Sequence, residues 1–303
     1  MTSVSLFQFS LCFKSPRTPQ KCGVFVCLYF WTFLLFFLSH HAYAKPKAEP
    51  KEIRLTSNIS SDLSATDQIR NVFGKYSIES PELYDGNHQS FEHIKIVKDK
   101  DIKSAFIFHI HRDLDGDRDK NWPKGKERQR NEIKGYQSSP ESLKGKISET
   151  HYIKWCLKID KSFKVTKAFC HFFQLKAVGS QNIDAPILTL SGVNQGGIPQ
   201  LQLQWWTAEE SKRTFLFGWE ECKGKWLICE SRCHYNRNGY FQFSIQSLDG
   251  LLNVETFQKL ETWREGFSFV RPKWGIYRSI AGVKDKMNLE DHVLINNILV
   301  KKK

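Results

Sequence analysis

The stretch SFVRPKWGIYRSI, residues 268–280, decides the fold class of this chain. Its side chains alternate in character with a period of two, which is the period of a β-strand. Trp274 and Ile276 then point into a core, whereas Lys273 and Tyr277 share the opposite face. One face of this strand is therefore apolar and packed, and the other carries polar groups.

The chain from residue 67 onward has the same character. Its segments are short, β-branched or aromatic, and turn signals such as Asn238-Gly239 and Asp249-Gly250 separate them. Strands are expected at Glu92–Val97, Ala105–Arg112, Glu127–Tyr136, His151–Ile159, Lys167–Ala177, Ile187–Ser191, Gln200–Trp206, Thr214–Trp219, Lys225–Tyr235, Tyr240–Leu248, Gly275–Ala281 and His292–Lys301. Short helices are expected at Ser64–Val72 and Leu251–Leu260. Many short strands without a second linker predict one all-β domain, a concanavalin-like sandwich of the β-jelly-roll type.

The composition indicates a polyanionic partner. The 303 residues contain 45 Lys and Arg against 32 Asp and Glu, a formal net charge of +13. Aromatic residues make up 14% of the chain, which excludes an intrinsically disordered protein. Net charge alone does not distinguish nucleic acid, an anionic membrane and an acidic polysaccharide.

The first 44 residues narrow this choice. Basic residues precede an apolar run, Gly23–Leu38, and the sequence Ala42-Tyr43-Ala44 follows it, as in a cleaved secretory signal. The alternative is a retained signal-anchor, although the run is short for a bilayer span of about 20 residues. Removal of the signal, with its three cations, leaves a net charge of +10. We therefore expect a secreted, monomeric protein whose partner is an anionic polysaccharide, with no nucleic acid and no membrane involved. Residues 45–66 are expected to form a flexible leader to a domain of residues 67–303.

Five cysteines remain after signal removal, an odd number that leaves at least one outside an intrachain disulfide. Secretion favours disulfide bonds. Cys229 and Cys233 lie four residues apart on one expected strand, about 13 Å, too far to bond each other. Asn58 begins the N-glycosylation sequon Asn58-Ile59-Ser60, in a stretch that we expect to be exposed.

Two more strands carry alternating polar groups. In Glu127–Tyr136, one face holds four charges, namely Arg128, Arg130, Glu132 and Lys134. Such a row is either a solvated outer face or the floor of a charged groove. In the segment 171–176, strict alternation places Gln174 and Lys176 together and His171 on the opposite face.

Arg130-Asn131-Glu132, Gln174-Leu175-Lys176 and Lys273-Trp274-Gly275-Ile276-Tyr277 together resemble the motifs of the β-jelly-roll polysaccharide lyases, a group that includes alginate lyases, glucuronan lyase and heparin lyase I. Those enzymes carry R-x-E, Q-x-H and K-x-G-x-Y strands that face one concave groove. The stretches ERQRNEIKGYQSSPESLKG, HFFQLKAVG and SFVRPKWGIYRSI look like the heparin-lyase-I-like subgroup. The resemblance covers about residues 75–300.

The resemblance implies cleavage of a uronic acid chain by β-elimination. The enzyme removes the proton at C5 and expels the sugar linked at O4, so the adjacent carboxylate must be neutralised. Arg130 and Gln174 would bind that carboxylate. Tyr277 would act as base, acid or both, with a pKa lowered from about 10 by Lys273 or Arg130. The residues expected to contact substrate or support the site are Glu132, Lys134, Lys273, Arg278 and Gln89.

One position departs from the group, because Lys176 stands where those enzymes carry His. His171 lies nearby, and only a β-bulge would turn it into the groove. The acidic run 113–119 does not fit an EF-hand, since Arg118 occupies the position of the required glycine. A looser calcium site at Asp113, Asp115 and Asp117 is the alternative to a plain acidic turn, and no other cofactor is expected.

Two other functions remain open. A non-catalytic glycan-binding jelly roll would use the same basic groove without turnover, and the Lys176 departure leaves this alternative open. A glycoside hydrolase needs two placed carboxylates, and neither E-x-D-x-x-E nor E-x-D-x-E occurs in the chain.

Overall fold

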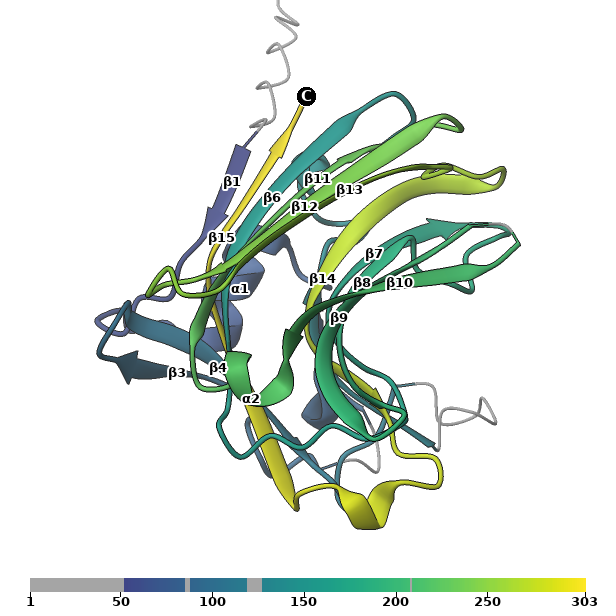
Figure 1. Ribbon diagram of the computed structural model, residues 1–303. Coiled ribbons are helices and arrows are strands. Elements are labelled where there is room, and N and C mark those ends of the chain that lie inside the picture. The colour runs from purple at the N-terminus through teal and green to yellow at the C-terminus, as the bar shows by residue number, and fades with distance from the viewer. Residues whose placement is uncertain (1–51, 85–87, 119–126, 208) are drawn as a thin grey trace, which may run out of the picture. The chain divides into compact units, whose positions relative to one another are not determined.

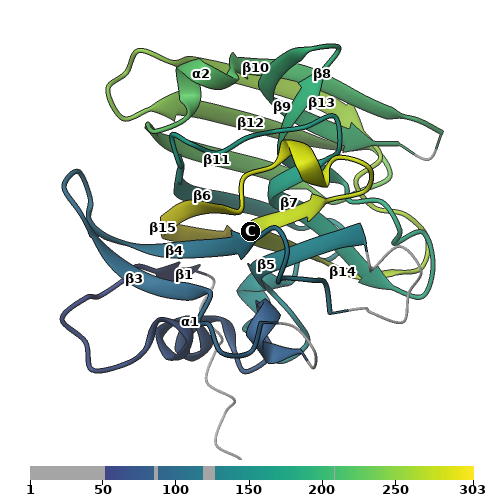
Figure 2. The same ribbon diagram turned by 90° about the horizontal axis from the view of Figure 1, so that it is seen from below.

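Two antiparallel β-sheets pack face to face in this protein. The computed structural model describes residues 52–84, 88–118, 127–207 and 209–303, and the predicted signal lies outside them. Figures 1 and 2 show the two sheets, with short helices at their margins. The architecture confirms the predicted all-β sandwich of the jelly-roll type.

The first sheet has eight strands, and β15 lies near its middle. In spatial order its strands are β13 (Asn253–Leu260), β12 (Gly239–Ser247), β11 (Trp226–His234), β6 (Thr150–Ile159), β15 (Glu290–Lys302), β4 (Lys103–His111) and β3 (Ile94–Asp99), with β1 (Glu52–Leu55) paired to β15.

The second sheet has seven strands and is strongly curved, as β14, β7, β8 and β9 show in Figure 1. In spatial order its strands are β10 (Ser211–Gly218), β9 (Ile198–Trp206), β8 (Leu188–Gln195), β7 (Cys170–Gly179), β14 (Phe267–Ser279), β5 (Arg128–Lys134) and β2 (Ile78–Glu79). The three strands with the motifs, β5, β14 and β7, are neighbours in it.

The helices are short. The first, α1 (Ala65–Phe73), begins where the Ser64 hydroxyl accepts a hydrogen bond from the Asp67 amide, a typical N-cap. This confirms the helix expected at Ser64–Val72. The others are α2 (Trp219–Cys222) and the 3-10 turns η1 (Pro81–Leu83), η3 (Glu141–Leu143) and η4 (Lys284–Lys286). The helix expected at Leu251–Leu260 is wrong, because those residues mostly form the edge strand β13.

The flexible leader expected at residues 45–66 is wrong from Glu52 onward, and residues 45–51 lie outside the described residues. From Glu52 onward this segment belongs to the domain, because β1 pairs with β15 in the register Glu52↔Lys301 to Leu55↔Ile298. Backbone hydrogen bonding to a strand far along the chain holds it, and the buried Leu55 anchors it in the core. Asn58, just beyond β1, is exposed, as the glycosylation prediction requires.

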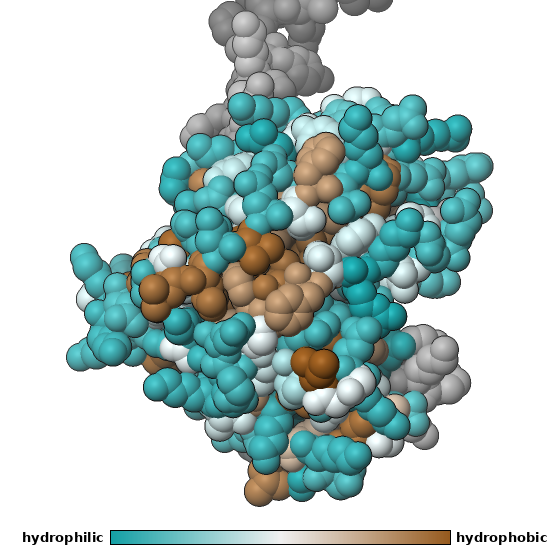
Figure 3. Space-filling view, in the orientation of Figure 1, coloured by the Kyte–Doolittle hydropathy of each residue, from teal (hydrophilic) through white to brown (hydrophobic). Residues whose placement is uncertain are grey.

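Aromatic rings join the two sheets. Trp155 of β6 stacks on Phe173 of β7 with ring centroids 4.2 Å apart, and Trp274 of β14 lies 5.8 Å from Phe173. All three are completely buried. Truncation of such a ring to alanine costs about 3–5 kcal/mol. Figure 3 shows that the side facing the viewer is mostly hydrophilic, with apolar side chains gathered near its centre.

The five cysteines of the domain are not joined by disulfide bonds. Four are buried, and burial raises the pKa of the Cys170 and Cys222 thiols to about 12. The predicted disulfide bonds are therefore not present in this structure, in which all five thiols are free. Within the described ranges, no helix is long and apolar enough to cross a membrane.

Candidate active site

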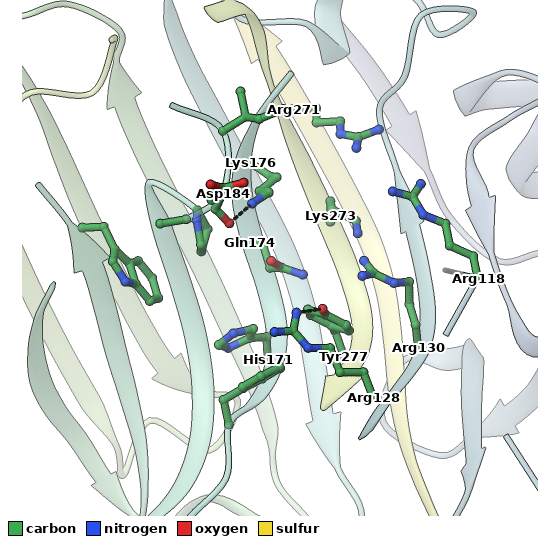
Figure 4. Close-up of a pocket in the computed structure, with 15 residues that line it drawn as sticks. Arg118, Arg128, Arg130, His171, Gln174, Lys176, Asp184, Arg271, Lys273 and Tyr277 are labelled. Carbon is green, nitrogen blue, oxygen red and sulfur yellow. Dashed lines mark hydrogen bonds between the residues drawn. The ribbon is translucent and has the colours of Figure 1, made fainter. Parts of the chain in front are cut away.

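A groove of about 800 Å³ lies over β5, β14 and β7. Figure 4 shows its side chains rising from these neighbouring strands. Six Arg and Lys side chains line it: Arg118, Arg128, Arg130, Lys176, Arg271 and Lys273. Among the described residues, Asp184 is the one carboxylate in its lining. The groove is therefore suited to an anionic ligand.

The charged row of β5 lies at the base of this groove, which Arg128 and Arg130 line directly. Arg130, Glu132 and Lys134 are 8%, 1% and 4% exposed, so they are not a solvated outer face. Pairing with β14 places Lys134 opposite Lys273 and Arg130 opposite Tyr277. Of the two interpretations of this row, the groove floor is correct.

Two buried carboxylates, Glu79 of β2 and Glu132 of β5, hold the cations of the floor. The Lys273 ammonium lies 2.7 Å from Glu79 and 2.5 Å from Glu132. Lys134 and Arg118 both bind the other oxygen of Glu79. Burial alone would raise the pKa of Glu79, but Lys273 and the neighbouring cations hold it well below its usual value.

Arg130 is expected to bind the substrate carboxylate, yet its guanidinium already has protein partners. Its Nε and Nη2 donate to Asp117 at 2.8 and 3.0 Å, and its Nη1 donates to Glu132 at 2.8 Å. The guanidinium lies 3.8 Å from the centre of the Tyr277 ring. Its position thus fixes the tyrosine and adds positive charge beneath it.

Tyr277 faces the groove, as predicted. Its hydroxyl accepts a hydrogen bond from Arg128, marked by a dashed line in Figure 4. Burial raises the pKa of Tyr277, while Arg130 and Arg128 oppose the rise without reversing it. The expected lowering is therefore wrong for the free protein, because the ring is deeper than sequence alone reveals. The hydroxyl is protonated at neutral pH and available as a proton donor.

His171 also faces the groove, although strict alternation along β7 turns it away. Pairing with β8 shifts between His171 and Phe173, so a β-bulge reverses the alternation there. The imidazole lies opposite Tyr277, with ring centroids 6.1 Å apart, and its Nδ1 is 2.7 Å from the Ser191 hydroxyl. Burial, and then the cations of the groove, first among them Lys176, lower the pKa of His171 to about 3. The ring is neutral at neutral pH and can accept a proton.

A glycine makes the adjoining bend in β14 possible. Gly275 has φ +135°, and a Cβ there would lie 2.1 Å from the backbone oxygen of Asn131. The register of β14 against β7 shifts between Trp274 and Tyr277, around this residue. Only glycine allows this approach of β14 to β5.

Gln174 and Lys176 lie on the groove side of β7, as predicted. The Gln174 amide donates to Glu132 at 2.6 Å, which leaves its second amide hydrogen for a ligand. Lys176 donates to the backbone oxygen of Asp184. Burial, followed by repulsion from Lys273 and Arg130, lowers the pKa of Lys176 to about 7.

Two predicted substrate contacts lie elsewhere. Arg278 is fully buried between the sheets, where it binds Asp291 at 2.5 Å and Gln129 at 2.8 Å. It follows Tyr277 and so points to the opposite face of β14. Gln89 is exposed in a turn and does not line the groove.

Several lining residues were not predicted as site residues. Arg128 and Arg271 lie two positions before Arg130 and Lys273, so the same alternation was a signal for both. Arg118 comes from a loop, and no local pattern marks it. Trp206 lines the groove while Trp205 is buried, as expected for adjacent strand residues.

The three carboxylates considered for calcium do not converge. Asp113 binds Arg112 and Lys284, whereas Asp117 binds Arg130. Asp115 is turned to a group of histidines on another side of the loop. Their placement gives the calcium hypothesis no support.

The sequence matches no known protein family profile and no curated protein. The fold is similar to that of solved polysaccharide lyases. The marine PL-14 alginate lyase from Aplysia kurodai is 12% identical, with 82% of this chain and 97% of that chain covered and a TM-score of 0.51. The endo-β-1,4-glucuronan lyase from the fungus Trichoderma reesei is 14% identical, with 76% and 95% covered and a TM-score of 0.45. An alginate lyase from Pseudomonas aeruginosa is 12% identical, with 75% and 97% covered and a TM-score of 0.49. At these identities the likeness concerns the fold.

Proposed function

We propose that this chain is a secreted polysaccharide lyase that cleaves a uronate-containing anionic polysaccharide by β-elimination. The observation that carries the proposal is the pair of His171 and Tyr277, a proton acceptor and a proton donor, in a groove lined by six Arg and Lys side chains. The shared fold with solved lyases supports it. Secretion rests on the sequence of residues 1–44 alone.

The cations of the groove would bind the uronate and neutralise its carboxylate. Arg128 and Lys176 flank the His171–Tyr277 pair, and the Gln174 amide lies between them on the floor (Figure 4). Neutralisation makes the C5 proton acidic enough to remove, because the enolate-like intermediate is then stabilised. Arg130 would act from beneath, as a fixed positive charge rather than a direct ligand.

The proton steps follow from the two protonation states. His171 takes the proton from C5, the C4–O4 bond breaks as a C4=C5 double bond forms, and Tyr277 gives its proton to the departing O4. A bound carboxylate offsets the groove cations, which raises the pKa of His171 toward a useful value for a base. Return of the proton from His171 to Tyr277 through solvent completes the cycle, and no water is consumed.

The test is an ultraviolet assay for the unsaturated product on glucuronan, alginate, heparin and pectate. We expect a rise in absorbance with at least one polymer, a loss of about 100-fold or more in Tyr277→Phe and in His171→Gln, and full activity in Tyr152→Phe. Tyr152 is a matched control, because its hydroxyl binds Glu230 on the other sheet. Full activity of Tyr277→Phe would overturn the catalytic assignment. New reducing ends without unsaturation would indicate hydrolysis.

A second function, glycan binding without catalysis, has one observation in its favour. Arg130 and Gln174, the side chains expected to clamp the substrate carboxylate, are both bound to Glu132. Co-sedimentation with a polymer that the protein does not cleave, weakened by Arg128→Met and unaffected by Tyr277→Phe, would favour this function over the lyase.

A further inference from the structure

A second cluster of polar side chains lies outside the groove, at the edge of the eight-stranded sheet. His93 precedes β3, His111 ends β4, and Asp115 lies in the turn that follows β4. His88, from the segment before β3, completes the group. The four ligand atoms all lie within 4.8 Å of one another.

Their spacing fits one tetrahedral ion. His93 Nε2 and His88 Nδ1 lie 2.9 and 3.3 Å from Asp115 Oδ1, and His111 Nδ1 lies 3.2 Å from Oδ2 of the same carboxylate. Zinc bonds of about 2.0–2.1 Å at tetrahedral angles place neighbouring ligands about 3.3 Å apart. The distances from the three nitrogens to the Asp115 carboxylate are therefore close to those between neighbouring ligands of one ion.

One nitrogen of the cluster has no hydrogen bond. His88 Nδ1 is buried and unpartnered, although it lies beside Asp115. A buried polar atom without a partner is costly, and such an atom calls for an explanation such as an ion. A protonated His93 ring between Glu82 and Asp115 would account for the hydrogen bonds of those three side chains without an ion. It would leave the buried His88 Nδ1 without a hydrogen bond.

The surroundings of His93 match those of a metal-binding histidine. Its Nδ1 lies 2.7 Å from Glu82 of η1, which fixes the ring so that Nε2 faces the cluster. Zinc-bound histidines typically have such a carboxylate on the second ring nitrogen. His93 is completely buried, while His88 and His111 have side chains 19% and 14% exposed, which leaves a path for an ion.

We propose that His88, His93, His111 and Asp115 bind one structural Zn²⁺ ion. Three imidazoles and one carboxylate favour zinc over calcium, which takes oxygen ligands. The ion would fix the turn after β4. That turn positions Asp117 for its ion pair with Arg130. Its Asp115 carbonyl accepts a hydrogen bond from the Gln129 side chain, and its Gly116 carbonyl accepts one from the Arg130 backbone amide. The proposal does not depend on the lyase function.

The test is metal content and stability of the mature chain after chelation and titration with Zn²⁺ alone. We expect one equivalent of tightly held zinc and a higher thermal midpoint, both lost in Asp115→Asn and in His88→Gln. With Co²⁺ in place of zinc we expect the intense visible absorption of a tetrahedral site. His88→Gln is informative even if Asp115→Asn does not fold, because His88 makes no hydrogen bond through Nδ1.

The control is His292→Gln. His292, with His109 and Glu290, forms a second and more exposed group of ligand atoms on the same sheet. We expect this variant to retain one equivalent of zinc. Failure of the unaltered chain to retain stoichiometric zinc, or loss of zinc in His292→Gln but not in His88→Gln, would overturn the proposal.

Discussion

The Glu79→Gln substitution tests whether a single buried carboxylate holds the floor of the groove. Glu79 is completely buried and contacts four cations: Lys134, Arg118, Lys273 at 2.7 Å and Arg130 at 3.5 Å. Lys273 and Arg130 keep Glu132 as a partner, whereas the ammonium of Lys134 loses the one carboxylate that it contacts among the described residues. Removal of one partner from a buried ion pair costs about 3–5 kcal/mol.

That cost predicts a drop in thermal midpoint of about 6–20 °C, at about 2–4 °C per kcal/mol for a domain of this size. Urea unfolding at pH 7 gives the free energy directly. The unaltered protein should exceed Glu79→Gln in free energy of unfolding by the full amount above about pH 4.5, the usual pKa of a glutamate. This difference shrinks as pH falls toward the much lower pKa of Glu79 in the folded protein.

The matched control is Glu52→Gln. Glu52 also pairs with two cations, Lys301 at 2.8 Å and Arg54 at 2.6 Å, but at the surface. Solvent screens such pairs, so we expect no resolvable change in midpoint. Equal stability of the Glu79 and Glu52 variants would refute the reasoning that the buried network needs this carboxylate.

Three further results are expected. Because burial and the neighbouring cations lower the pKa of Lys176 to about 7, its charge is lost as pH rises through 7; the apparent KM for polymer should therefore rise above pH 7, and Lys176→Met should remove that dependence. Gly275→Ala should lower the melting temperature by about 10 °C or more, because the added Cβ would clash with the Asn131 carbonyl oxygen. Gly250→Ala is the control, since no atom lies within 4 Å of a Cβ there, and a smaller decrease for Gly275→Ala than for Gly250→Ala would contradict the packing argument. A reducing agent should leave the melting temperature unchanged, because the five cysteines of the domain form no disulfide, and a decrease would show a bond that the structure lacks.

The sequence predicted the sandwich and the groove floor because alternation is a local signal. β5 and β14 carry their polar groups in strict phase, and the register Tyr277↔Arg130 brings the two motifs together as expected. Alternation failed at His171, where the bulge depends on how β7 pairs with β8.

Features that depend on distant partners escaped prediction. β1 is held by β15, from the other end of the chain, and Glu79 reaches the groove only through the pairing of β2 with β5. In the edge strand β13, the apolar residues Val254, Phe257 and Leu260 recur every third position, a spacing that resembles the apolar face of an amphipathic helix. The pKa of Tyr277 depends on burial, and burial follows from packing rather than from local sequence.

The position of β15 has a consequence for how the protein is made. This strand, residues 290–302, lies between β4 and β6 and also pairs with β1, so contacts join residues about 250 positions apart. Until it is synthesised, β4 and β6 have unpaired edges, and the larger sheet remains divided. Long-range pairing of this kind makes folding slow. The larger sheet can therefore close only once β15 has been made, and until then the open edges of β4 and β6 are exposed to aggregation or to chaperones.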